Sequence, residues 1–105
     1  MAREQFQTLT EPMYYILLSL MEECCGVDIM EKVETISAGR VKVGPGTLYA
    51  MLSKFEENHI IVKTAEIGRR KSYVITDLGK EMVEKEYKSY GLWRKTENDI
   101  LEKKI

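Results

Sequence analysis

Apolar residues in the first quarter of the chain predict a strongly hydrophobic helix. Thr10-Glu11-Pro12 has the features of a helix start, with a capping hydroxyl, an acid near the positive helix end and a proline in the first turn. The residues that follow, as far as Met21, are apolar on nearly every side, and we expect the helix to span residues 10–25 and to be stopped by Gly26. A helix of this kind must be covered on more than one side, which indicates a partner subunit.

Two further helices follow. Four apolar residues at helical spacing predict the second, which Ser37-Ala38-Gly39 closes: Ile29, Met30, Val33 and Ile36. Gly44-Pro45-Gly46-Thr47 opens the third, whose inner face carries Leu48, Met51, Leu52 and Phe55. The opposite face is small and polar, with Ala50, Ser53 and Lys54. Such a face suits insertion into a groove, whereas a merely solvated face more commonly shows several Glu–Lys pairs, and periodicity leaves both readings open.

A hairpin and a last helix complete the pattern. Residues 60–64 and 72–75 are β-prone, and the turn between them, Gly68-Arg69-Arg70-Lys71, carries three adjacent cations. Like charges at a hairpin tip repel, so we expect an anionic partner there. Thr76-Asp77 can cap the last helix, whose apolar stripe consists of Val83, Tyr87, Tyr90, Trp93, Ile100 and Leu101.

This order of elements predicts a mainly α fold with a small β-hairpin, a winged helix-turn-helix followed by a long C-terminal dimerisation helix. We expect the DNA-binding part to span residues 1–75 and the dimerisation helix residues 76–105, in one compact unit. In such folds the second helix of the turn motif enters the major groove, and the hairpin contacts the neighbouring backbone.

The net charge of -1 hides a strong asymmetry. Residues 1–39 carry two basic and seven acidic side chains, residues 40–76 seven basic and three acidic ones, and residues 77–105 seven of each. Phosphate contacts depend on where charge is placed rather than on its total, so the basic middle segment is compatible with nucleic-acid binding.

Other features of the 105 residues narrow the class of protein. No apolar run approaches the roughly 20 residues of a membrane span, and the polar N-terminus lacks the order of a signal peptide, so we expect a cytoplasmic location and no membrane partner. The adjacent Cys24 and Cys25 argue against a disulfide framework or zinc finger; we expect them to be buried at the end of the first helix, with thiol sensing as the alternative.

The sequence contains no pattern typical of an enzyme. A phosphate loop, a nucleophile motif, a cluster of metal ligands and an acid–base pair are all missing from it. His59 follows a helix end, where a cation is ordinary, and has no acid, serine or cysteine beside it in sequence. We therefore expect neither catalysis nor a metal or other cofactor.

Four segments of the chain resemble the PadR family of bacterial transcriptional regulators. They read LTEPM from Leu9, VGPGTLY from Val43, GRRKSY from Gly68 and ITDLGK from Ile75, in register from about residue 9 to about residue 85. The chain departs from the family pattern at Val27, where an aromatic residue is common, and at Ser72, where tyrosine often follows the basic turn. The resemblance implies a regulator of the small subfamily, often a ligand-responsive repressor, that dimerises through its first and last helices.

Two sets of site residues follow from the pattern and the resemblance together. Phosphates and base edges can accept hydrogen bonds from side-chain hydroxyls and from the free amides of a helix start that glycines flank. Cations add electrostatic attraction to the phosphates. The expected DNA-binding residues are Lys42, Gly44, Pro45, Thr47, Tyr49, Ser53, Lys54, Arg69, Arg70 and Lys71. The expected dimer and ligand pocket is formed by Met13, Leu17, Val83, Tyr87, Tyr90, Trp93, Ile100 and Leu101.

The sequence thus favours a homodimeric, sequence-specific DNA-binding regulator, in the form of a repressor that reads an inverted-repeat operator in double-stranded DNA. A small aromatic or planar effector would release it, bound between methionines and flat rings that adapt to varied ligands, and the alternative for these rings is a filled dimer core without a cavity. The alternative is a winged-helix module that binds another protein instead of DNA.

Overall fold

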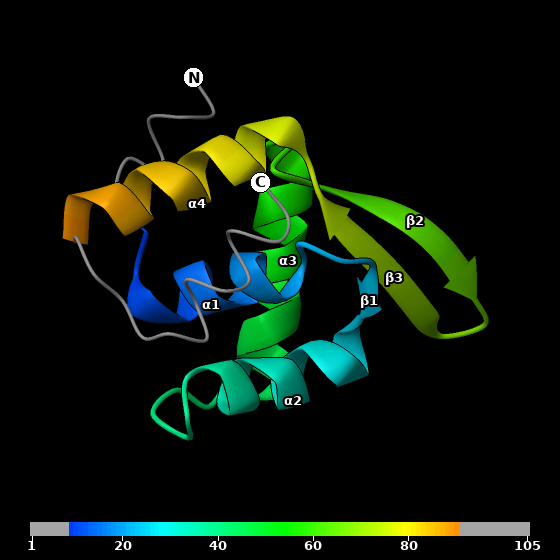
Figure 1. Cartoon of the computed structure of the whole chain (residues 1–105). Helices are drawn as coiled ribbons and strands as arrows, with labels where there is room; N and C mark the ends of the chain where they lie inside the picture. Colours follow the sequence, from blue (N-terminus) through cyan, green and yellow to red (C-terminus); the bar gives the residue numbers. More distant parts are fainter. Residues whose placement is uncertain (1–8, 91–105) are drawn as a thin grey trace.

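The computed structural model of the chain describes residues 9–90 and their side chains as far as Glu86. It consists of four helices and a small antiparallel sheet with the strand order β1-β3-β2 (Figure 1). The elements are α1 (Glu11–Ser19), β1 (Cys24–Cys25), α2 (Gly26–Ile36), α3 (Pro45–Glu57), β2 (Ile61–Ile67), β3 (Arg70–Ile75) and α4 (Asp77–Tyr90). The mainly α architecture with a hairpin is confirmed, whereas the C-terminal part of the expected dimerisation helix lies outside the described residues.

The start of α1 is as predicted, but its end is not. The Met13 amide donates to Thr10 Oγ1 at 3.4 Å, which is the expected cap. The helix ends at Ser19 instead of residue 25, because the Leu20 carbonyl accepts a hydrogen bond from the Ile75 amide at 2.9 Å and the chain turns towards the sheet.

The cysteines form a strand that the sequence pattern did not predict. Cys24 lies opposite Tyr73 and Cys25 opposite Ser72, so β1 is an edge strand of the sheet. The expectation that both cysteines end the first helix is therefore wrong. Gly26 does not stop a helix either, since it is the first residue of α2.

The apolar side chains of α1 are covered within a single chain. Five of them are at most 1% exposed, Tyr14, Tyr15, Ile16, Leu17 and Leu18, and so is Leu20, which follows the helix as its C-cap. Helices α2 and α4 pack against α1 (Figure 1). Burial of this helix therefore does not require a second subunit, which removes that argument for a dimer.

Helices α2 and α3 form as predicted. The chain leaves α2 through Ala38 and Gly39, both at positive φ, and the Val41 amide donates to the buried Ser37 Oγ at 2.9 Å. In α3, Leu48, Leu52 and Phe55 are buried and Met51 packs against the core at their edge.

The β2–β3 hairpin, here called the wing, is longer than predicted. Its strands continue past residue 64 and begin before residue 72, so that the turn itself contains only Gly68, at φ +61°, and Arg69. Arg70 and Lys71 belong to β3, where Lys71 pairs with Glu66. A bulge between Lys63 and Ala65 interrupts the ladder.

Helix α4 is fixed at its start by close backbone contact. The Gly79 amide donates to Thr76 Oγ1 at 3.2 Å, and Thr76 Oγ1 in turn donates to the Ile60 carbonyl at 2.9 Å. Further along α4, the buried Glu86 Oε1 accepts from the Leu9 amide at 2.9 Å. No helix in the described range 9–90 has the length and apolarity to cross a membrane.

Replacing Gly79 by alanine should destabilise the fold. A Cβ there would lie 2.5 Å from the Ile60 carbonyl oxygen and 2.5 Å from Ile75 Cγ1, and backbone cannot give way as a flexible side-chain end can. We expect a loss of about 1–3 kcal/mol in the free energy of unfolding, measured by urea denaturation. Gly46→Ala is the control, because nothing lies within 4 Å of its Cβ position. Equal stability of the two variants would contradict the close approach of α4.

Candidate nucleic-acid interface

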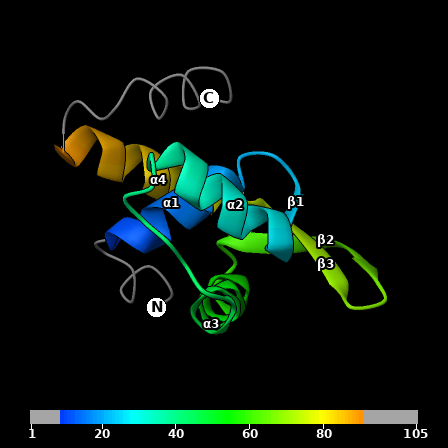
Figure 2. The same ribbon diagram turned by 90° about the horizontal axis from the view of Figure 1, so that it is seen from below.

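Helix α3 presents the outward face that its sequence predicts. Thr47, Ala50, Ser53 and Lys54 are exposed on it, as are Lys42, Gly44 and Pro45 just before or at its start. Gly44 caps the helix without any side-chain hydrogen bond, so the first-turn amides are not occupied by a capping side chain. Figure 2 shows α3 end-on, apart from α1 and α4, with the wing extending to one side.

Tyr49 does not stand free on this face. Its ring lies over Gly26 at the start of α2, where a Cβ would be 2.6 Å from the Tyr49 hydroxyl oxygen and 2.9 Å from Cε1. The side chain is 45% exposed, so one side of the ring contacts α2 and the other faces solvent. Gly26 therefore sets the position of Tyr49, a role that the sequence pattern did not reveal.

Arg70 is held against the start of α2 by a cysteine. Its Nη2 donates to Cys25 Sγ at 3.3 Å, and the Cys25 thiol donates to Asp28 Oδ2 at 3.2 Å. The hydrogen bond to Cys25, followed by the electrostatic effects of Cys25 and then Asp28, raises the pKa of Arg70. Arg70 therefore folds back onto β1 and α2 rather than standing at the wing tip.

The other wing cations differ in their surroundings. Lys71 lies opposite Glu66, whose pKa is lowered mainly by its 2.7 Å hydrogen bond to Lys63 and further by the charge of Lys71. The same hydrogen bond raises the pKa of Lys63. Within the described residues, Arg69 has no hydrogen bond or ion pair.

The three expected wing cations thus have unequal roles. Arg70 and Lys71 have acidic neighbours in the same chain, Asp28 and Glu66, which offset part of the repulsion among the three cations. All three side chains are exposed, and Arg69, in the turn, is the one for which neither a hydrogen bond nor an acidic neighbour is found in the described part of the chain.

The two thiols point to different surroundings, as neighbouring residues of a strand must. Cys25 faces Arg70, whereas Cys24 is buried beneath α2, and this burial raises the pKa of its thiol although Lys32 acts to lower it. Both cysteines are free. In the described part of the chain no three histidine, cysteine or acidic side chains gather as metal ligands would.

The expected dimer and ligand pocket is only partly described. Leu17 and Val83 are fully buried in the core of their own chain and offer no surface to a second copy, which corrects their assignment. Met13 is partly buried against the same core. The side chains of Tyr87, Tyr90, Trp93, Ile100 and Leu101 lie outside the described residues.

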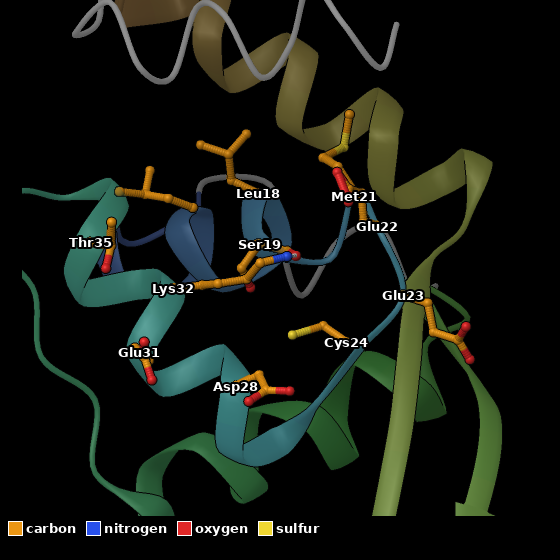
Figure 3. A pocket seen from close by; sticks show the side chains of 11 residues that line it. Leu18, Ser19, Met21, Glu22, Glu23, Cys24, Asp28, Glu31, Lys32 and Thr35 are labelled. Atoms are coloured by element: carbon orange, nitrogen blue, oxygen red, sulfur yellow. Dashed lines mark hydrogen bonds between the residues drawn. The ribbon is translucent and has the colours of Figure 1, made fainter.

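A cleft of about 580 Å³ lies elsewhere, between the end of α1, β1 and α2 (Figure 3). Its lining is acidic and apolar, and includes Asp28, Glu31 and Cys24. Sequence reasoning missed this cleft, although the excess of acidic residues before residue 40 was a signal for it.

Comparison with known proteins identifies a family. A model of the "Transcriptional regulator PadR-like family" matches residues 16–85. An uncharacterized 37.1 kDa protein of transposon TN4556 from Streptomyces fradiae is 33% identical over 61 residues, which is 58% of this chain. The match covers only 17% of that protein, so the chain spans about a sixth of its length.

Solved structures share the fold at low identity. A transcriptional regulator from Clostridium thermocellum aligns with a TM-score of 0.64 and 21% identity over 76% of this chain and 83% of its own. RosR from H. salinarum aligns with a TM-score of 0.69 and 22% identity over 92% and 90%. A complex structure named hsRosR-S4 aligns with a TM-score of 0.69 and 22% identity over 98% and 91%.

Replacing Gly26 by alanine should displace the Tyr49 ring. Because the ring is half-exposed, it can swing into solvent, and we expect the free energy of unfolding to fall by no more than about 1 kcal/mol. The Tyr49 ring resonances should move in NMR spectra of the folded variant, and Gly46→Ala should leave them in place. Unmoved Tyr49 resonances in Gly26→Ala would show that the ring does not rest on Gly26.

Proposed function

The chain belongs to the PadR-like family of transcriptional regulators, and on this premise we propose that it is a sequence-specific repressor that inserts α3 into the major groove of an operator. The family consists of transcription regulators, so the chain is not an enzyme. The observation that carries the proposal is the exposed, small and polar face of α3, flanked by Tyr49 and by uncapped helix amides.

Each part of this surface suits a different part of DNA. Thr47 and Ser53 carry hydroxyls for phosphates or base edges, and Lys54 adds a charge. The exposed side of the Tyr49 ring suits the sugar-phosphate backbone. From the wing, Arg69 supplies an exposed cation that has no hydrogen bond or ion pair within the described chain, and the neighbouring phosphates are its expected target.

The alternative function, binding of another protein through the wing, draws support from one observation. Ile67 at the wing tip is 78% exposed, and an apolar tip is more typical of a protein contact than of a phosphate contact. Salt dependence separates the two functions, because phosphate neutralisation releases counterions in proportion to the number of contacts.

We further propose a homodimer in which residues 1–75 bind DNA and residues 76–105 supply the dimer contact. Support comes from the family likeness and from the apolar stripe Tyr87, Tyr90, Trp93 of the sequence, which advances by three residues at each step. Those rings also suit a planar or aromatic effector at the dimer centre, whose binding would release the operator.

Binding to an inverted repeat should show a steep salt dependence. Half-sites are expected one helical turn, about 34 Å, apart or at a multiple of it. If each subunit neutralises three to four phosphates, log K against log salt should have a slope of about -5 to -7, measured by gel shift or fluorescence anisotropy on the gene's own upstream region.

In the same assay, Arg69→Ala should flatten the slope by about 2, since a dimer loses one contact per subunit. Thr47→Ala should weaken binding while leaving the slope near its original value. Lys85→Ala is the control, because Lys85 lies exposed on α4, which runs away from the wing (Figure 1). A slope that Arg69→Ala leaves unchanged would remove the wing from the DNA surface.

Substituting the end of the apolar stripe should separate the proposed dimer. The double variant Ile100→Asp, Leu101→Asp would place two carboxylates in the proposed apolar contact, where burying a charge is costly. We expect analytical sedimentation at micromolar concentration to show a monomer for this variant and a dimer for the wild type. Lys103→Asp and Lys104→Asp, also near the C-terminus, serve as a control for added negative charge. A wild-type chain that sediments as a stable monomer would contradict the homodimer.

A further inference from the structure

The cleft between α1, β1 and α2 combines an apolar floor with an acidic rim. Leu18, Met21 and Ile36 contribute the apolar surface, and Asp28 and Glu31 contribute carboxylates. Glu23 also lines the cleft, but its carboxylate is directed away from it and accepts a hydrogen bond from Thr64 Oγ1 (Figure 3). Its volume of about 580 Å³ lies within the range of small-molecule sites, about 300–1,000 Å³.

The charge of the lining is one-sided. Among the described residues, Asp28 and Glu31 bring two carboxylates to the cleft, and Lys32 brings one cation. The Lys32 ammonium is already turned towards α1, where its Nζ donates to the Ser19 carbonyl oxygen at 3.4 Å. The cleft thus accommodates one tethered ammonium group beside its apolar floor, and the charges of Asp28 and Glu31 together exceed that of Lys32.

Asp28 connects this cleft to the wing. It lines the cleft, and its Oδ2 also accepts the hydrogen bond from the Cys25 thiol to which Arg70 donates. Figure 3 shows the neighbouring Cys24 thiol directed into the cleft, so β1 forms one wall of it. Any group that neutralises Asp28 weakens the attraction that holds Arg70 against α2.

We propose that the cleft binds a small organic cation with an apolar body, and that the bound cation loosens Arg70 of the wing by neutralising Asp28. The apolar body contacts the floor, and the cationic group lies between the carboxylates of Asp28 and Glu31 in competition with the Lys32 ammonium. The site is separate from the aromatic stripe of the last helix. Its consequence for DNA binding rests on the proposed function, but cation binding and the movement of Arg70 do not.

Benzyltrimethylammonium is a suitable probe, with benzenesulfonate as a ligand of similar size and opposite charge. We expect titration of the full chain, followed by calorimetry or NMR, to detect the cation and not the sulfonate. Glu31→Gln should weaken cation binding about two- to fivefold, as expected for one partly exposed ion pair. Glu34→Gln removes the same charge from α2 outside the cleft lining and should leave affinity unchanged.

Lys32→Met gives the opposite expectation. It keeps an apolar stem but removes the competing ammonium, so the probe should bind several-fold more tightly. Lys80→Met, on α4 and outside the cleft lining, should have no effect. Equal binding of cation and sulfonate, or equal effects of the cleft and control variants, would overturn the site.

The link to the wing has its own readout. Saturation with benzyltrimethylammonium should move the Arg70 Nε–Hε resonance, and Asp28→Asn should move it in the same direction without the probe and abolish the further change. An Arg70 resonance that stays in place at saturation would overturn the link. Failure of the proposed function is seen separately, as absence of operator binding by the free protein, because the cleft and Arg70 measurements need no DNA.

Discussion

The pairing of two residues of β1 with β3 is the constraint on which the arrangement of the molecule depends. Through Cys24 and Cys25, the connection between α1 and α2 pairs with strand β3 of the wing. A further hydrogen bond, from the Ile75 amide to the Leu20 carbonyl, strengthens this contact. The strand has little stability of its own, because two residues bury little surface. Its effect is geometric: at Cys25 and Gly26 the start of α2 meets both Tyr49 of α3 and Arg70 of the wing.

The features predicted correctly are those fixed by neighbouring residues. The Thr10 cap of α1, the αL exit from α2 at Gly39 and the Gly44-Pro45 start of α3 each depend on a few consecutive positions. The buried and exposed faces of α3 follow from its period alone. The family likeness was recognisable for the same reason, since its motifs lie at these caps and turns.

The features that the sequence did not predict depend on residues far apart in the chain. The end of α1 is determined by an amide 55 residues later, at Ile75, and no local pattern contains that information. The role of Arg70 depends on Cys25, 45 residues away. Three consecutive cations look like one patch in the sequence. In the structure, however, Arg69 lies in the turn, Arg70 contacts Cys25 and Lys71 lies opposite Glu66. The cleft likewise lies between three elements, α1, β1 and α2, so the sequence pattern of any one of them could not predict it.

The bulge in β2 has a consequence for how copies of this protein coexist. Because β3 is the central strand, β2 offers a free edge of backbone donors and acceptors that another β-strand could extend. The irregular register at Thr64 breaks that edge, and the Lys63–Glu66 ion pair places opposite charges on either side of it. A bulge and charged side chains on an edge strand both disfavour its pairing with another strand, so the wing can extend into solvent without offering a regular template to the wing of a second molecule.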